Sequence, residues 1–226
     1  MNSTRKPIRV YGKDLRDNPG RMMMLAYVVD KCGYKCDYCY NIRPRTGAVM
    51  DLGALEKLTR QLVENHGREI LLDLIGGEVT EHPGLFEFAK IRHSAMTVAI
   101  YSNFSKDISL YRRLIQAGYT LILTYHPHVD PDVFLDKFAG FDISDYDKIV
   151  AMSVMYRPGS SERALYVFDQ MRIRFPQFKS IDLSLLDANE YFPNVRYSKQ
   201  EMADFNRLSS RFGIGNTVVE YDDGSS

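Results

Sequence analysis

The chain has 226 residues, 45% of them hydrophobic, and its 29 basic and 29 acidic residues give a formal net charge of zero. This length supports one well-packed core, and no Pro-, Gly- or Ser-rich stretch divides it, so we expect one domain. Scattered, balanced charges do not attract nucleic acid, and no apolar run could cross a membrane, so we expect a cytoplasmic protein with neither partner.

Hydrophobic runs of strand length alternate along the chain with segments of helical period, which is the pattern of repeated βα units feeding a parallel sheet. The strands are expected at residues 22–29, 70–75, 96–101, 120–124, 149–155 and 181–186. Helices are expected to begin after Asp51, near Pro83, at Ser105 or Asp107, at Pro131, and at Ser160 or Ser161. Six such units predict an α/β fold, a partial (β/α)6 TIM-like barrel over residues 21–190 with the helices outside, following an N-terminal extension of residues 1–20.

The C-terminal part, residues 191–226, is expected to hold one more helix and a tail. Ser198 and Glu201 have the spacing of a capping box, and this helix is expected to pack across one end of the barrel. Residues 217–221 have the composition of a strand, and the turn-forming Asp222-Asp223-Gly224 follows with nothing to pair with that strand. We therefore expect the natural protein to continue past Ser226.

Polar residues follow the predicted strands directly. In a parallel α/β barrel all carboxyl ends of the strands lie at one face, and enzymes build their sites there. The residues that follow this rule are Cys32, Cys36, Cys39, Glu78, Ser102, Asn103, Thr124, His126 and Arg157. Their predicted convergence indicates an enzyme.

The chain's three cysteines, Cys32, Cys36 and Cys39, lie within eight positions, whereas secreted disulfide frameworks distribute an even number along the chain. Thiolates hold iron–sulfur clusters, and three of them on a four-iron cluster leave one iron open to a ligand. The C-x3-C-x2-C spacing, with aromatic Tyr38 before the third cysteine, resembles the signature of the radical S-adenosylmethionine (radical SAM) superfamily. The alternative is a structural zinc site completed by a distant histidine.

The resemblance covers roughly residues 21–187 and implies a [4Fe-4S] cluster on the three cysteines with S-adenosylmethionine bound to it. In that superfamily an electron from the cluster cleaves the cofactor, and a 5′-deoxyadenosyl radical abstracts hydrogen from a substrate. It also implies flavodoxin or ferredoxin as the electron donor.

Several further residues match positions that contact the cofactor in the superfamily. Gly76-Gly77-Glu78 resembles its Gly-Gly-Glu motif, which meets the cofactor's amino group, although Val79 stands where Pro is common. Ser102, Asn103 and Thr124 resemble its polar contacts to the carboxylate and ribose, or are an ordinary helix cap and strand residue. Arg157 is either a bidentate partner of the carboxylate or a surface arginine.

His126 and His128 differ from the residues that related enzymes often carry at this strand end. They are expected to position substrate, transfer protons or bind a second metal, or else to be loop histidines without such a role. The stretch of residues 25–44 resembles the superfamily members with C-terminal cysteine-rich extensions, which act on peptides or small molecules. A glycyl-radical-enzyme activator and a non-catalytic zinc-binding interaction module are the alternative functions.

Overall fold

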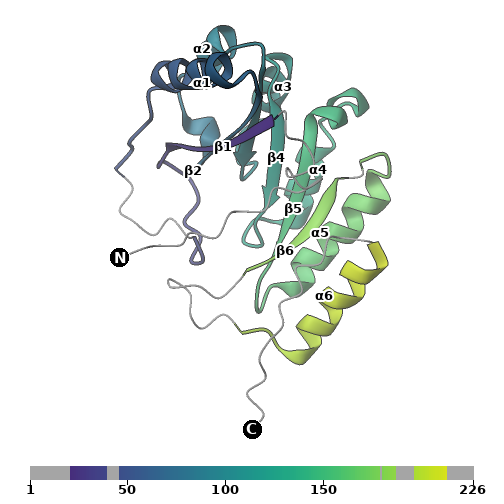
Figure 1. Cartoon of the computed structure of the whole chain (residues 1–226). Helices are drawn as coiled ribbons and strands as arrows, with labels where there is room; N and C mark the ends of the chain where they lie inside the picture. The colour runs from purple at the N-terminus through teal and green to yellow at the C-terminus, as the bar shows by residue number, and fades with distance from the viewer. Residues whose placement is uncertain (1–20, 40–45, 179, 187–195, 213–226) are drawn as a thin grey trace.

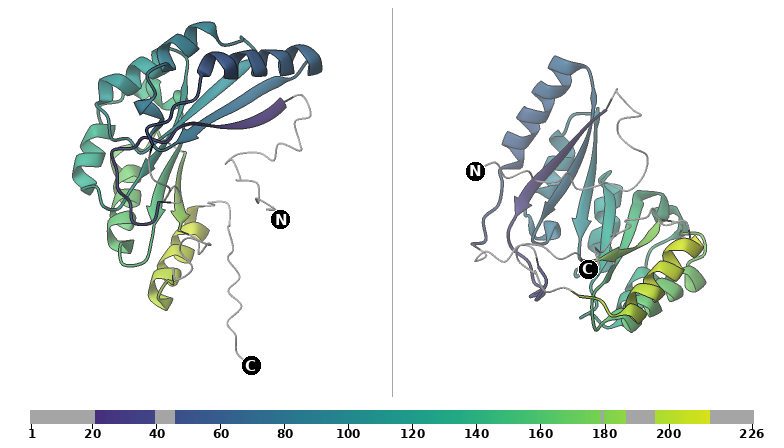
Figure 2. Two further views of the ribbon diagram at one scale, coloured as in Figure 1. Left: turned by 90° about the vertical axis from the view of Figure 1, so that its left-hand side faces the viewer. Right: turned by 60° about the horizontal axis from the view of Figure 1, so that its bottom comes forward.

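A computed structural model describes residues 21–39, 46–178, 180–186 and 196–212, which form a curved parallel sheet with helices on its outer side (Figures 1 and 2). The six strands lie in the sheet in chain order, and all neighbouring strands are parallel. They are β1 (Arg21–Val29), β2 (Glu69–Gly76), β3 (Met96–Ser102), β4 (Thr120–Tyr125), β5 (Ile149–Tyr156) and β6 (Ile181–Leu185). The predicted α/β partial barrel is confirmed.

The helices alternate with the strands as the sequence predicts. They are α1 (Leu52–His66), α2 (Leu85–Ile91), α3 (Ile108–Gln116), α4 (Pro131–Phe138), α5 (Ser161–Arg174) and α6 (Lys199–Phe212). Two short 3-10 helices, η2 (Val79–Glu81) and η3 (Ile143–Lys148), were not predicted. None of the described helices is both long enough and apolar enough to pass through a membrane.

The helix boundaries follow from local capping. The Asp51 carboxylate accepts hydrogen bonds from the Gly53 and Ala54 backbone N–H groups, at 2.8 and 3.3 Å, and so begins α1. Gly67 ends α1 with a left-handed φ of 62°. At the start of α6 the predicted capping box is present, since the Glu201 N–H donates to the Ser198 hydroxyl and the Ser198 N–H donates to the Glu201 carboxylate.

The two faces of the sheet differ in composition. Outward-facing strand residues such as Leu72 and Leu74 are fully buried in the main core against the helices. The inward face has a separate cluster of Ala99, Ile122 and Ala151, with Tyr101 packed against it. The two alanines leave space inside the curve of the sheet for a ligand.

A segment following the cysteine loop covers part of the outer edge of β1. The Met50 N–H donates to the Val28 carbonyl at 2.8 Å, and the Asp30 N–H donates to the Ala48 carbonyl at 3.1 Å. Val49 forms an antiparallel bridge with Val29. The last residues of β1 are therefore paired on both sides.

Helix α6 lies beside α5 (Figure 1) and contacts the carboxyl end of β5. The Tyr156 hydroxyl donates to the Glu201 carbonyl at 2.8 Å, and the Phe205 ring packs 5.6 Å from the Tyr156 ring. The expected extension of residues 1–20 and the expected tail strand of residues 217–221 lie outside the described residues.

Candidate active site

The cysteine loop begins in close contact with the end of β2. The Gly77 N–H donates to the Val29 carbonyl at 2.7 Å, and the Glu78 N–H donates to the Lys31 carbonyl at 2.8 Å. A Cβ atom at Gly76 would lie 2.1 Å from the Val29 carbonyl oxygen, and one at Gly77 would lie 2.5 Å from that of Lys31. Only glycine permits this approach, so the Gly-Gly pair places the first cysteine directly beside β2.

A cavity of about 360 Å³ lies beside this loop at the carboxyl ends of the strands. Its wall contains most of the residues that the sequence singled out, namely Cys32, Cys36, Cys39, Tyr38, Gly76, Gly77, Ser102, Asn103, Thr124 and His126. Three of the predicted site residues, Glu78, His128 and Arg157, are absent from this wall. The strand ends therefore bring together residues that span more than 90 positions, as the barrel topology predicts.

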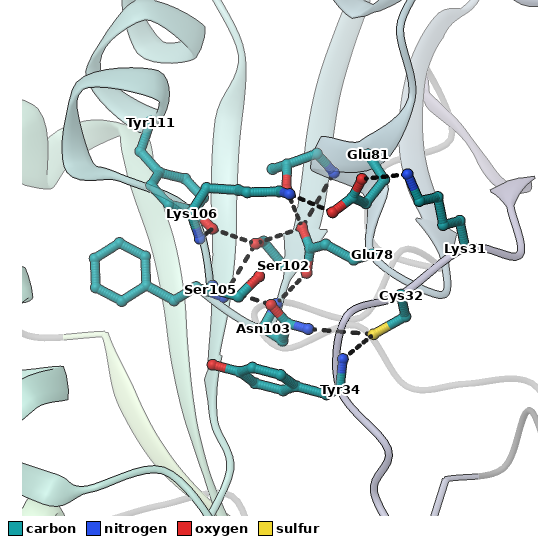
Figure 3. Close-up of polar contacts among 12 residues, drawn as sticks. Lys31, Cys32, Tyr34, Glu78, Glu81, Ser102, Asn103, Ser105, Lys106 and Tyr111 are labelled. Atoms are coloured by element: carbon teal, nitrogen blue, oxygen red, sulfur yellow. Dashed lines mark hydrogen bonds and ion pairs between the residues drawn. The ribbon is translucent and has the colours of Figure 1, made fainter.

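Glu78 is almost fully buried, and its carboxylate accepts hydrogen bonds from neighbouring residues of the chain (Figure 3). Its Oε1 accepts hydrogen bonds from the Thr80 N–H and hydroxyl, at 3.1 and 2.6 Å, and from the Ser102 hydroxyl at 2.8 Å. Its Oε2 accepts from the Asn103 N–H at 2.8 Å. Burial raises the pKa of Glu78, and the hydrogen bonds oppose that rise.

The Glu78 carboxylate also holds the turn after β3 through Ser102 and Asn103. The predicted contact of Glu78 with the cofactor stays a prediction. Ser102 is held a second time, because its hydroxyl lies 2.9 Å from the Tyr111 hydroxyl. Phe104 follows with a φ of 56°, which is uncommon for a residue other than glycine, and its N–H donates to Ser102. Glu78 is thus a positioning residue for Ser102 and Asn103.

The fixed turn directs the Asn103 side chain toward the first cysteine (Figure 3). Its Nδ2 donates to the Cys32 sulfur at 3.4 Å, and the Tyr34 N–H donates to the same sulfur at 3.4 Å. Hydrogen-bond donors favour the thiolate form of a cysteine, which is the form that binds metal.

His126 and His128 lie against the second cysteine. Their Nδ1 atoms are 4.0 and 3.9 Å from the Cys36 sulfur, and the Tyr34 ring packs edge-on against both imidazoles. The Tyr38 hydroxyl lies 2.9 Å from His126 Nδ1. Burial lowers the pKa of His126 to about 4, with a further contribution from His128, so His126 is neutral at neutral pH.

Arg157 connects the cysteine loop to the end of β5. Its Nη1 lies 2.7 and 2.9 Å from the two carboxylate oxygens of Asp37, and its guanidinium lies 5.0 Å from the centre of the Tyr38 ring. The hydrogen bond from Arg157 lowers the pKa of Asp37. The sequence predicts two alternative roles for Arg157, a partner of the cofactor's carboxylate or a surface arginine. It does not predict this ion pair with Asp37, which lies 120 positions away in the chain.

The donor set fits an iron–sulfur cluster. All three thiols line one cavity, and backbone and amide N–H groups point at one of them. Within the described ranges, no three His, Cys, Asp or Glu side chains are grouped as the ligands of a single metal ion would be. A four-iron cluster takes its thiolates at separate iron atoms, which is a different arrangement from ligands around one ion.

Sequence reasoning missed Tyr34, Tyr101 and Met155, which also line the cavity. Tyr101 and Met155 occupy inward positions on β3 and β5, and the alternation of strand residues was the signal that could have identified them. Tyr34 lies inside the cysteine motif itself, where spacing carries no information about ring packing.

Several solved structures share this fold. The structure of anSMEcpe with bound AdoMet and the Kp18Cys peptide has a TM-score of 0.65 and 14% identity, covering 85% of this chain and 60% of that chain. BtrN in complex with AdoMet and 2-DOIA has a TM-score of 0.50 and 16% identity, covering 84% and 85%. HydG, a maturase of the [FeFe]-hydrogenase, has a TM-score of 0.50 and 15% identity, covering 86% and 51%.

No family model and no curated protein matches the sequence. The chain spans about three fifths of the length of the anSMEcpe chain. At these identities the likeness shows the fold, so the chain has the partial α/β barrel that it shares with these structures.

Proposed function

We propose that the chain is a radical SAM enzyme in which Cys32, Cys36 and Cys39 hold a [4Fe-4S] cluster and the adjoining cavity binds S-adenosylmethionine. One observation carries the proposal: the three thiols share a cavity with the Gly76-Gly77 strand end and Asn103. The structural neighbours, which are radical SAM enzymes, support it through their fold. When bound, the cluster supplies the electron that cleaves S-adenosylmethionine to a 5′-deoxyadenosyl radical, which abstracts hydrogen from the substrate.

The chain's own residues bind S-adenosylmethionine and orient it. Gly76 and Gly77 leave their backbone open beside the cysteine loop, so that the cofactor's amino group can approach closely. Asn103 and Thr124 supply neutral amide and hydroxyl groups for its carboxylate and ribose. Tyr38, held by His126 and covered by Arg157, is proposed to contact the cofactor from the wall of the same cavity.

The substrate belongs on the inward face of the sheet, next to the cavity, and we propose a peptide or a small molecule. The anSMEcpe structure contains a peptide and the BtrN structure contains 2-DOIA, so the fold takes ligands of both kinds. Flavodoxin or ferredoxin is the proposed electron donor.

The test is anaerobic reconstitution of the chain with iron and sulfide. We expect a brown protein with the paramagnetic resonance spectrum of a reduced four-iron cluster, and that spectrum should change when S-adenosylmethionine is added. After reduction with dithionite, 5′-deoxyadenosine should accumulate. Cys39→Ala should abolish all three signals, whereas His66→Gln, a change in the last turn of α1, should leave them intact.

A colourless protein that retains zinc and never forms 5′-deoxyadenosine would refute the proposal and favour the zinc-binding module.

A further inference from the structure

The strands contain few charged residues, and their placement is uneven. Arg21, Glu69, Asp73 and Asp182 are the only Lys, Arg, Asp or Glu residues in β1 to β6. Arg21 and Glu69 form an exposed ion pair at the start of β1 and β2, 2.8 Å apart. Asp73 and Asp182 are both buried. The strands therefore give the inward face acidic groups and no basic one.

Asp73 points to the inward face because its neighbours Leu72 and Leu74 point to the helices. The Tyr101 hydroxyl donates to Asp73 Oδ2 at 3.3 Å. No cationic side chain of the described residues forms an ion pair with this carboxylate. Burial raises the pKa of Asp73 to about 6.

The surroundings of Asp73 are apolar. Its partners across the sheet are Leu25 on β1 and Ala99 on β3, and Ala99 packs with Ile122 and Ala151. A carboxylate buried among such groups with one long hydrogen bond lowers stability compared with an aliphatic residue. Buried carboxylates that lower the stability of the fold are typical of binding sites.

The Asp73 carboxylate is connected both to the cavity and to an open surface. Tyr101, which donates to it, also lines the cavity beside the cysteine loop. Leu25, its neighbour in register on β1, is 45% exposed, and Tyr27, further along β1, is 39% exposed. Asp73 itself is 5% exposed and does not line that cavity, so a ligand that reaches its carboxylate must lie along the inward face between Tyr101 and the exposed part of β1.

We propose that Asp73 binds the ammonium group of an aliphatic primary amine, which is the substrate class of this enzyme. The carboxylate supplies the opposite charge, the apolar inward face accommodates an alkyl chain, and the strands provide no cation that would repel the ligand. This inference rests on the proposed function, because the reacting carbon must lie beside the S-adenosylmethionine cavity.

The experiment uses the full chain, reconstituted with its cluster and saturated with S-adenosylmethionine, in isothermal titration calorimetry. The probes are Nα-acetyl-lysine methylamide, which represents a peptide, and cadaverine, which represents a free aliphatic diamine. The neutral control is Nα,Nε-diacetyl-lysine methylamide. We expect at least one of the two amines to bind. The neutral control should bind at least tenfold more weakly than that amine.

Asp73→Asn keeps the side-chain shape and removes the charge, and it should weaken amine binding about tenfold or more. The matched control is Glu69→Gln, which removes the same charge from the exposed start of the same strand and should leave binding unchanged. Equal affinity of Asp73→Asn and wild type for the amines would overturn the inference. Equal binding of amines and the neutral control by wild type, or binding of neither amine, would also overturn it.

Failure of the proposed function gives a different result, namely no cluster and no 5′-deoxyadenosine from the wild-type chain without any probe.

Discussion

Replacing Glu78 with Gln tests whether this buried carboxylate organises the candidate active site. A Gln side chain can keep one acceptor oxygen for Thr80 and Ser102, but its amide NH2 then faces the Asn103 N–H, which now donates to Oε2 at 2.8 Å. One hydrogen bond to a carboxylate oxygen is lost, and two donors face each other in a buried site. This costs about 3 kcal/mol.

Removal of a buried charge offsets part of that loss, since burial raises the pKa of Glu78. The loss exceeds this effect because the Gln amide places a donor opposite the Asn103 N–H, which needs an acceptor there. We therefore expect Glu78→Gln to lower the free energy of unfolding by about 2 kcal/mol.

The assay is urea denaturation of the reduced, metal-free protein followed by circular dichroism. The control is Glu87→Gln, an exposed carboxylate paired with Lys90 on α2, for which we expect a change of less than about 0.5 kcal/mol. The second readout is cluster content after reconstitution, which should fall because Asn103 no longer holds its position beside Cys32. An unfolding free energy equal to or above that of wild type would refute the positioning role of Glu78.

Three further changes have defined outcomes. Gly77→Ala places a Cβ 2.5 Å from the Lys31 carbonyl oxygen, so it should destabilise the fold by about 3 kcal/mol and reduce cluster loading; wild-type iron content would contradict this. Asp73 has a folded-state pKa of about 6 against an ordinary 3.8, so it lowers the stability of the fold as pH rises from about 4 to 6. Asp73→Asn should therefore be more stable than wild type at pH 7, on the order of 1 kcal/mol, and similar to it at pH 4 in thermal unfolding; an equal difference at both pH values would contradict the shift. Asp37→Asn breaks an exposed pair with Arg157 and should cost less than about 1 kcal/mol in urea denaturation, so a loss above about 2 kcal/mol would show that the pairing does more than the exposure of Asp37 suggests.

Much of the fold was predictable because parallel strands covered on one or both faces read as short, nearly continuous apolar runs. The expected strand at residues 120–124, for instance, corresponds to β4 (Thr120–Tyr125), and the other predicted strands match to within one residue at each end. The helices were marked by caps such as Asp51 and Gly67. The two 3-10 helices were missed because one or two turns leave no apolar period to detect.

The cavity wall was predictable for a different reason, since strand ends converge in this topology whatever the loops do. Individual contacts were not. The Glu78 carboxylate binds the backbone N–H of Asn103, and the next residue, Phe104, has an unusual φ; no residue pattern predicts either feature. Arg157 pairs with Asp37, and only the folded chain shows that these two loops meet.

The segment that pairs with the end of β1 has a consequence for association between molecules. An open sheet has two outer strands whose free N–H and C=O groups can add a strand from another copy. Residues 48–50 occupy those groups on β1 next to the cysteine loop, at the Val28 and Asp30 backbone. Strand addition from a second molecule is thereby blocked beside the cysteine loop, so edge-to-edge aggregation at β1 is restricted to the amino-terminal part of the strand.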